Sequence, residues 1–345
     1  MDIQNATSSI GANMVANATV LSTPTFFTDN VSTYMRKKLS NEIKSFILSS
    51  NIQTGFSNLD KIIGKLYPGF YVLGAGSSIG KTTFLLQMAD QMINDGKQVI
   101  YFTMEQSQLE LVTKSLSRLT AIACKKNPQM AKTAIEIRNG NISQVVQDAY
   151  KDYLLDADYF TIVQGDFTTD IASINKTVDD YVKATNAVPV IMIDYLQIIQ
   201  EDMLTDKAKV DYITKSLKIL QRKYNTVVIA VSSINRSNYL LQIDFEAFKE
   251  SGSIEYSADV VWGLQLQILN DPTFAQAKNV SQRRKLIAMA KAASPRKVEL
   301  VCLKNRYGIA SYSCGFLYYP QYDLFTPDIS YKNSIVACPT PQTII

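Results

Sequence analysis

The chain has 345 residues, a net charge of +4, and 46% hydrophobic and 19% charged residues, an ordinary globular composition long enough for one or two domains. The charge is only mildly positive, so any nucleic-acid site is expected to be local rather than spread over the surface. The absence of histidine excludes a histidine general base, a serine–histidine pair and a histidine metal site. The four cysteines are far apart and form no C-x-x-C pair, which argues against a zinc site and is typical of a reducing, cytoplasmic compartment.

The N-terminal part contains neither a basic leader nor a run of about 18 apolar residues, so we expect no signal peptide and no membrane contact. Residues 1–30 are rich in Asn, Ser, Thr and Ala without a clear period, which predicts a flexible segment. Residues 31–50 carry an apolar stripe with cations on the other faces, which predicts a linker helix. Such a helix packs either on its own domain or on a neighbouring subunit, and both remain open.

An apolar strand then leads into a loop of small residues and a helix that begins near Lys81. The phosphate-loop pattern G-x-x-x-x-G-K-[ST] needs glycine where this chain has Ala75. Gly76 and Gly80 still permit positive φ and close backbone approach, and the free N–H groups at the helix start attract an anion. Lys81 is expected to reach the β- and γ-phosphates of a nucleotide, and Thr82 to ligate Mg²⁺. A Gly/Ser turn that ends in Lys-Thr is the alternative. The predicted nucleotide-binding residues are Ala75, Gly76, Ser77, Ser78, Ile79, Gly80, Lys81, Thr82 and Thr83.

From residue 52 onward, apolar runs that predict buried strands alternate with helical patterns. Continuous apolar strands between helices predict an α/β fold with a mostly parallel sheet covered by helices on both faces. The last strands follow one another with no strong helix between them, which predicts an antiparallel edge at the C-terminal side. Glu299 in one of these runs predicts that one face of its strand is less buried. Strands are expected at 70–73, 99–103, 160–163, 188–193, 227–231, 260–266, 298–303 and 312–319, and helices at 81–95, 106–121, 142–155, 170–184 and 207–223.

One segment interrupts the alternation. Residues 268–297 are polar and basic, and we interpret them as a solvated surface insertion, with a nucleic-acid contact as the alternative. The remaining boundaries follow from the pattern: residues 51–330 are expected to form one domain, and 331–345 a C-terminal tail.

Two of the predicted strands are followed by acidic residues that suit nucleotide chemistry. Asp194 directly follows the run 188–193, at the edge of the sheet where the phosphate loop also lies, and is expected to hold the shell of Mg²⁺ through water. Glu105 follows the run 99–103, and in a chain without histidine a carboxylate is the natural group to polarise an attacking water. The alternative for Glu105 is that it caps the helix that begins near Ser107.

The order of these elements resembles the C-terminal motor domain of the DnaB-type replicative helicases, a branch of the RecA-like ATPases, over residues 52–327. The resemblance implies a RecA-like P-loop NTPase that hydrolyses ATP with Mg²⁺, translocates on single-stranded DNA during replication and forms a homohexameric ring. Members of this family often carry alanine at the first phosphate-loop position, so Ala75 fits. The stretches that carry the resemblance are 54–60, 75–82, 104–105, 193–197, 232–236, 250–255 (Glu-Ser-Gly-Ser-Ile-Glu), 258–259 and 304–308 (Lys-Asn-Arg-Tyr-Gly).

The resemblance also implies residue roles. Glu105 becomes the catalytic glutamate, and Arg306, with Lys304 beside it, becomes a finger inserted into the ATP site of the neighbouring subunit. From the residues alone these are two cations near a sheet edge, for which a solvated turn is the alternative. The residues implied to contact DNA are Lys249, Glu250 and Gly252, with Arg236 as a plausible addition.

Two features depart from the family. Ser233 occupies a position where the family usually has a glutamine that relays the state of the γ-phosphate, and serine is too short to span the same gap. The helical N-terminal domain of the family has no counterpart in residues 1–50, so we expect a separate partner, such as a primase or an N-terminal-domain protein, unless the sequence is a piece of a longer chain. These departures keep two alternatives open: a RecA/RadA-like recombination ATPase, and a non-motor subunit that binds ATP and DNA as a loader.

Overall fold

The computed structural model describes residues 30–49, 51–166, 168–203, 205–248, 251–309 and 311–333, with only the backbone given at 45–49, 236, 237 and 251. The chain separates into two compact units, Met1–Leu48 and Ser49–Ile345. None of the described helices is both long and apolar enough to cross a membrane.

The first unit contains helices α2 (Val31–Lys37) and α3 (Leu39–Ser49) where the sequence predicted one linker helix. Asn30 caps α2 by accepting a hydrogen bond from the backbone N–H of Thr33 at 2.9 Å. The Tyr34 hydroxyl donates to Glu42 at 2.8 Å and ties the two helices together. No residue of α2 is buried, so this helix has no core of its own.

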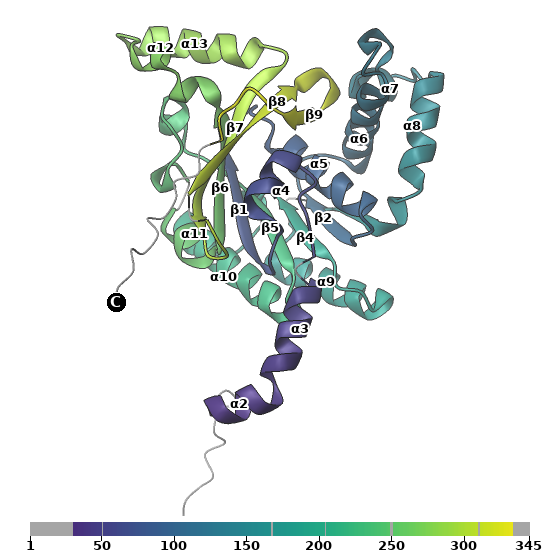
Figure 1. Cartoon of the computed structure of the whole chain (residues 1–345), viewed down its shortest axis with the longest axis vertical. Coiled ribbons are helices and arrows are strands. Elements are labelled where there is room, and N and C mark those ends of the chain that lie inside the picture. The colour runs from purple at the N-terminus through teal and green to yellow at the C-terminus, as the bar shows by residue number, and fades with distance from the viewer. Residues whose placement is uncertain are drawn as a thin grey trace, which may run out of the picture. The chain divides into compact units, whose positions relative to one another are not determined.

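The second unit is built on a nine-stranded sheet with the strand order β3-β2-β4-β5-β1-β6-β7-β8-β9 (Figure 1). Strands β1 to β6 pair in parallel, and β7, β8 and β9 continue the sheet in antiparallel fashion. The predicted parallel sheet with an antiparallel edge is therefore confirmed. The strands are β1 (Gly69–Ala75), β2 (Val99–Thr103), β3 (Phe160–Gln164), β4 (Val190–Asp194), β5 (Val227–Ser233), β6 (Val260–Leu266), β7 (Arg296–Asn305), β8 (Tyr312–Tyr319) and β9 (Leu324–Pro327).

Helices cover both faces of this sheet. Alternate residues of β1 enter two different cores: Tyr71 and Leu73 pack on the face covered by α5, and Phe70 and Val72 pack on the face covered by α9 and α10. Burial on both faces explains why the strand sequence is apolar without alternation. The helices are α4 (Ser57–Ile63), α5 (Lys81–Asn94), α6 (Gln108–Ala123), α7 (Ala134–Arg138), α8 (Gln144–Leu154), α9 (Ile171–Thr185), α10 (Asp206–Tyr224), α11 (Ser251–Ser257), α12 (Pro272–Ala275) and α13 (Val280–Ala292).

Two expectations about the C-terminal half hold only in part. Residues 268–297 are mostly solvent-accessible, as expected, but they form α12 and α13 and bury Ile287 in the core on the α5 face. The face of β7 that carries Glu299 is less buried than the other face, as expected, but Glu299 itself is fully buried. Its carboxylate accepts a hydrogen bond from Gln265 at 2.7 Å and further bonds from Asn270 and Tyr331. Burial raises the pKa of Glu299, and the three donors offset part of that effect.

Candidate nucleotide site

The phosphate loop joins the end of β1 to the start of α5, and its backbone conformation differs in one detail from expectation. Gly80 has a φ of +107° and serves as the left-handed N-cap of α5. A side chain there would bring a Cβ within 2.9 Å of Phe325 and 3.0 Å of Tyr318, so glycine is required for space as well as for conformation. Gly76 does not take positive φ; instead Ser78 does, at +63°.

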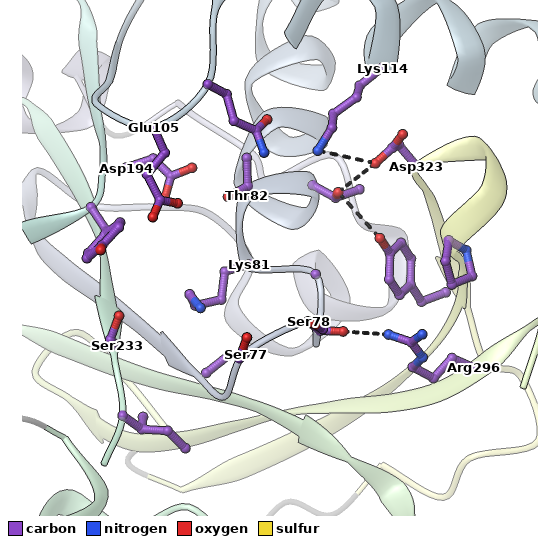
Figure 2. Close-up of a pocket in the computed structure, with 18 of the residues that line it drawn as sticks. Ser77, Ser78, Lys81, Thr82, Glu105, Lys114, Asp194, Ser233, Arg296 and Asp323 are labelled. Atoms are coloured by element: carbon purple, nitrogen blue, oxygen red, sulfur yellow. Dashed lines mark hydrogen bonds and ion pairs between the residues drawn. The ribbon is translucent and has the colours of Figure 1, made fainter. Parts of the chain in front are cut away.

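The loop opens onto a cavity of about 880 Å³ that brings most of the predicted residues together (Figure 2). The carboxyl ends of β1, β2 and β4 all reach this cavity, as expected for neighbouring parallel strands. Two predicted residues, Gly76 and Ile79, line a small neighbouring cavity instead. The predicted residues that line the large cavity are Ala75, Ser77, Ser78, Gly80, Lys81, Thr82, Thr83, Glu105 and Asp194.

Lys81 and Asp194 supply opposite charges on this cavity. The Lys81 ammonium lies 3.5 Å from the carbonyl oxygen of Gly76, and burial lowers its pKa, while the charges of Asp194 and Glu105 work to raise it. Asp194 is only 3% exposed, and burial raises its pKa against the opposing hydrogen bonds from Thr82 and Tyr101. Both groups are thus desolvated and in need of a charged partner.

The residues around Asp194 fit a magnesium ion. Its Oδ2 accepts a hydrogen bond from Tyr101 at 3.1 Å, whereas its Oδ1 is buried without a hydrogen-bond partner among the described residues. An orphaned carboxylate oxygen beside the Thr82 hydroxyl is the donor set that a hard cation takes. Within the described part of the chain no group of three or more His, Cys, Asp or Glu side chains could hold a metal by itself. An ion here would therefore share its shell with phosphate oxygens and water.

Glu105 stands at the mouth of the cavity and does not cap a helix. The N-cap of α6 is Ser107, which forms a reciprocal capping box with Glu110. The alternative reading of Glu105 as a cap is therefore wrong. Its side chain is exposed and lies near Tyr195, where burial and then the Glu105 charge raise the pKa of the Tyr195 hydroxyl. Glu105 therefore lines the cavity together with Tyr195.

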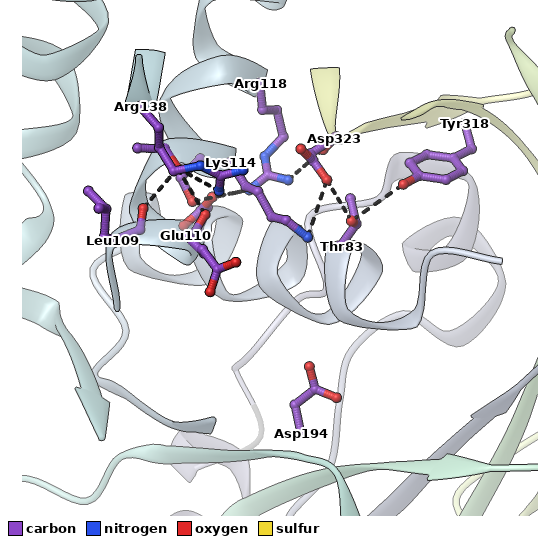
Figure 3. A network of polar contacts seen from close by, with 12 residues as sticks. Thr83, Leu109, Glu110, Lys114, Arg118, Arg138, Asp194, Tyr318 and Asp323 are labelled. Carbon is purple, nitrogen blue, oxygen red and sulfur yellow. Dashed lines mark hydrogen bonds and ion pairs between the residues drawn. The ribbon is translucent and has the colours of Figure 1, made fainter. Parts of the chain in front are cut away.

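The far wall of the cavity is a polar network that the sequence did not predict (Figure 3). Asp323 accepts a hydrogen bond from the Thr83 hydroxyl at 2.9 Å, and the Lys114 ammonium lies 3.6 Å from the same carboxylate. Buried Arg118 donates to the backbone carbonyl of Asp323 at 2.7 Å. Tyr318 completes this wall, with its hydroxyl 3.5 Å from that of Thr83. Apart from Thr83, which belongs to the phosphate loop, none of these residues lies in a short motif, so no local signal could have found them.

The basic segment 268–297 also reaches the site. Arg296 lines the cavity, and its guanidinium donates to the carbonyl oxygen of Ser78 at 2.5 Å. Lys291 donates to the carbonyl oxygen of Ser77 at 2.9 Å. The sequence indicated only a density of positive charge here, not its destination.

Ser233 lies on the cavity where the end of β5 meets it. An amide from the turn after β4 holds this position: Gln197 donates to the Ser232 hydroxyl at 2.8 Å and accepts from the Ser233 N–H at 3.2 Å. The backbone carbonyl of Gln197 in turn lies 3.5 Å from the Lys209 ammonium on α10. The Gln197 side chain thus contacts the end of β5 at the position where the family usually has a glutamine.

Lys304 and Arg306 are not among the described residues that line the cavity. Both instead cap the C-terminal end of α11, Lys304 through the carbonyl of Glu255 and Arg306 through that of Tyr256 at 3.5 Å. Arg306 also donates to Asp259 at 3.1 Å and keeps about half of its side chain exposed (49%). Burial lowers the pKa of Lys304, and repulsion from Arg306 adds to that shift.

Of the residues predicted to contact DNA, only part can be placed. Lys249 and Glu250 lie outside the described residues, as does the side chain of Arg236. Gly252 lies in the first turn of α11 and is half-buried, and a Cβ there would meet nothing within 4 Å.

Comparison with known proteins supplies independent findings. Residues 51–326 match the family described as DnaB-like helicase C terminal domain. A probable replicative DNA helicase of Trieres chinensis is 28% identical over 223 residues, which is 61% of this chain and 46% of that protein. The replicative DNA helicase DnaB of Haemophilus influenzae is also 28% identical, over 61% of this chain and 45% of that protein. The chain therefore spans less than half the length of these curated relatives.

Solved structures give the same picture of the fold. One solved ATPase domain superposes with a TM-score of 0.68 at 19% identity, covering 87% of this chain and 99% of that one. A DnaB-like replicative helicase, in a structure that describes its interactions with primase, superposes with a TM-score of 0.64 at 18% identity, covering 86% of this chain and 67% of that one. The predicted RecA-like helicase fold is confirmed by these likenesses.

Proposed function

The chain belongs to the family of DnaB-like helicase C-terminal domains, and from that premise we propose that it is an ATP-hydrolysing motor that translocates on single-stranded DNA during replication. The observation that carries the proposal is the convergence of Lys81, Thr82, Glu105 and Asp194 on one cavity next to a phosphate loop. These residues come from three separate strand ends, so their meeting is a product of the fold rather than of one motif.

The loop side of the cavity binds the phosphates of ATP. Backbone N–H groups at the start of α5 face an anion with the helix dipole behind them, and the Lys81 ammonium adds a charge whose desolvation is relieved by phosphate. Thr82 and, through water, Asp194 would hold a Mg²⁺ ion, which supplies charge neutralisation at the β- and γ-phosphate oxygens. The far wall around Asp323 and Tyr318 then receives the nucleoside.

Glu105 activates the water that attacks the γ-phosphate. In a chain without histidine a carboxylate is the natural base, and Glu105 is an exposed carboxylate that lines the cavity. Tyr195 lines the same cavity beside it. Asp194 does not suit this role, since it is buried and is the carboxylate proposed to hold the Mg²⁺ shell.

Arg306 completes a site on a neighbouring subunit. The half-exposed guanidinium lies outside the cavity of its own chain and is held by Asp259, so it is available to another copy. An arginine supplied in trans stabilises developing charge on the γ-phosphate and makes hydrolysis depend on assembly, here a ring of identical subunits, a homohexamer. Lys304 stands beside it as a second cation.

The DNA contact falls to the segment that leads into α11. The proposed contacts with the phosphates of a single strand are the basic side chain of Lys249 and the backbone of Glu250 and Gly252, and Arg236 is a further candidate. A primase or a separate protein that carries the family's N-terminal domain is the proposed partner, and the cytoplasm is the proposed compartment.

The test is a comparison of ATP hydrolysis with and without single-stranded DNA. We expect hydrolysis to rise with DNA, forked duplex to be unwound, and Lys81→Ala to abolish hydrolysis by removing the phosphate-binding charge. Mixing Arg306→Ala subunits into wild-type protein should lower hydrolysis more steeply than dilution does, since each variant subunit disables its neighbour.

The outcomes separate the alternatives. Equal hydrolysis with and without DNA, together with no unwinding, would exclude the motor and favour a loader that binds ATP and DNA. Strand exchange between homologous duplexes would favour a recombination ATPase instead. A linear response to Arg306→Ala mixing would remove the trans-acting finger and weaken the ring.

A further inference from the structure

Lys291 and Arg296 contact the phosphate loop from the side opposite its N–H groups. The Lys291 ammonium donates to the carbonyl oxygen of Ser77 at 2.9 Å. The Arg296 guanidinium donates to the carbonyl oxygen of Ser78 at 2.5 Å (Figure 2). Lys291 lies in the last turn of α13, and Arg296 is the first residue of β7. Two consecutive carbonyls of the loop are thus held by cations from one distant segment.

The geometry of the peptide bond gives these contacts a consequence. In a trans peptide the carbonyl and the following N–H point in opposite directions. Holding the carbonyls of Ser77 and Ser78 therefore fixes the direction of the N–H groups of Ser78 and Ile79. Ser78 has a φ of +63°, a left-handed conformation that a serine adopts only against resistance. Successive N–H groups around such a residue form an anion-binding concavity, so the cations hold the loop in the shape that receives phosphate.

The two cations are themselves held in place by their surroundings. Arg296 lies over the ring of Tyr318 at 5.5 Å from its centroid and donates to the backbone carbonyl of Lys291. The Lys291 ammonium lies 5.8 Å from the ring centroid of Tyr239. Buried Ile287 anchors α13 on the sheet one turn earlier. Among the described residues, the partners of both cations are carbonyl oxygens and aromatic faces, none of which is negatively charged. Both positive charges therefore attract an anion.

We propose that Lys291 and Arg296 are positioning residues of the phosphate loop, which set the direction of its N–H groups and add attraction for polyphosphate. The proposal rests on the proposed nucleotide-binding function and adds to it a second, distant source of affinity. It assigns a role to a segment that its sequence alone marks only as basic. Lys291 and Arg296 act through the loop and not on the nucleoside, so a ligand that lacks a nucleoside should respond to their loss as ATP does.

The experiment compares Lys291→Met and Arg296→Met with Lys285→Met, an exposed cation of the same helix, in the full chain. Dissociation constants are measured for a fluorescent ATP analogue and, by competition, for inorganic tripolyphosphate, which has no nucleoside. Steady-state kcat and KM for ATP are measured on the same proteins. Lys81→Ala serves as the reference for loss of the phosphate site.

Each methionine variant at 291 and 296 is expected to weaken both ligands about tenfold, the loss of one charge-assisted hydrogen bond to the loop. KM should rise by more than kcat falls, because the loop is misplaced before chemistry begins. Lys285→Met should stay within about twofold of wild type. Lys291→Arg and Arg296→Lys keep a cationic donor and should stay within about threefold, which keeps the test valid if a methionine variant unfolds.

Three results would overturn the proposal: unchanged affinity in both methionine variants, a loss for ATP with none for tripolyphosphate, or a tenfold loss in the conservative variants. The second would mean that the side chains contact the nucleoside. Failure of the proposed function looks different, since wild type itself would then not bind ATP or would be indifferent to Lys81→Ala.

Discussion

Replacing Asp259 with asparagine tests how much the buried carboxylate in front of β6 stabilises the fold through its contacts with β1, α10 and the residue after β7. The Asp259 carboxylate is 3% exposed and accepts hydrogen bonds from the Phe70 N–H at 2.8 Å, from Lys218 and from Arg306 at 3.1 Å. Burial works to raise its pKa, but the hydrogen bonds from Lys218 and Phe70 and the charge of Arg306 outweigh it and leave the pKa below the ordinary value. Asparagine keeps the shape and removes the charge.

The expected loss of stability follows from the exposure of each partner. Lys218 is 15% exposed, so losing its charge-assisted bond costs about 2–3 kcal/mol. Its remaining bond to Gln221 at 2.7 Å keeps the loss at the low end of the range for a broken buried pair. The pair with half-exposed Arg306 adds less than about 1 kcal/mol, because solvent screens it. We therefore expect Asp259→Asn to lower the free energy of unfolding by about 3 kcal/mol.

Urea unfolding followed by circular dichroism at about pH 7.5 measures this loss, and Lys218→Met and the double variant complete a cycle. The double variant should lose about 2 kcal/mol less than the sum of the single losses, since methionine removes the cation that asparagine leaves unpaired. A depressed carboxyl pKa stabilises the fold above the unfolded pKa, and this contribution is lost as the pH falls through the folded value. The gap between wild type and Asp259→Asn should therefore narrow below about pH 4. A loss under about 1 kcal/mol at neutral pH, or a coupling near zero, would refute the reasoning.

Three further expectations concern the cavity. Asp194→Asn should abolish hydrolysis. It should also raise the free energy of unfolding by about 1–2 kcal/mol at neutral pH. The reason is that burial raises the Asp194 pKa and leaves one carboxylate oxygen without a partner among the described residues, so the fold disfavours the ionised carboxylate. That gain should vanish as the pH falls below the ordinary carboxyl pKa, and a less stable variant in urea at neutral pH would contradict it. Glu105→Gln should reduce kcat by roughly 10²–10⁴-fold with ATP affinity within about threefold, and an equal loss of binding would disprove its role as base. Gly80→Ala should destabilise by about 2–4 kcal/mol because φ is positive and Phe325 lies 2.9 Å from the added carbon, whereas Gly96→Ala, with positive φ and open space, should lose only about 1–2 kcal/mol in the same thermal and urea assays.

The elements that sequence predicted well are those whose apolar pattern is local. The predicted strands 99–103 and 312–319 have the same bounds as β2 and β8. Such strands are predictable because burial on both faces requires a largely apolar sequence without alternation. The phosphate loop and the acids after β2 and β4 were found for a related reason: parallel strands deliver their carboxyl ends to one edge. Sequence order is then enough to infer that these side chains share a cavity.

The elements that sequence missed depend on distant partners. Strand β9 is only Leu324–Pro327 and pairs with β8, so its short pattern carries no signal of its own. Asp323 and Thr83 are far apart in the sequence, so no spacing rule predicts the hydrogen bond between them. The burial of Glu299 itself was not predicted, because a charge in a strand predicts exposure unless its hydrogen-bond partners are known. Those partners lie on β6, after β6 and beyond β9.

At Ser233, where the family usually has glutamine, a glutamine from another part of the fold contacts the end of β5. β4 and β5 are neighbouring parallel strands, so the turn that follows β4 lies beside the end of β5. From this turn the Gln197 side chain hydrogen-bonds to both the Ser232 hydroxyl and the Ser233 N–H, and its backbone carbonyl lies near Lys209 on α10. An amide thus bridges the cavity edge even though position 233 carries none. If hydrolysis in the cavity is transmitted toward α10, we expect the displacement to pass through the Gln197 side chain and the backbone of β5, and not through the side chain of residue 233.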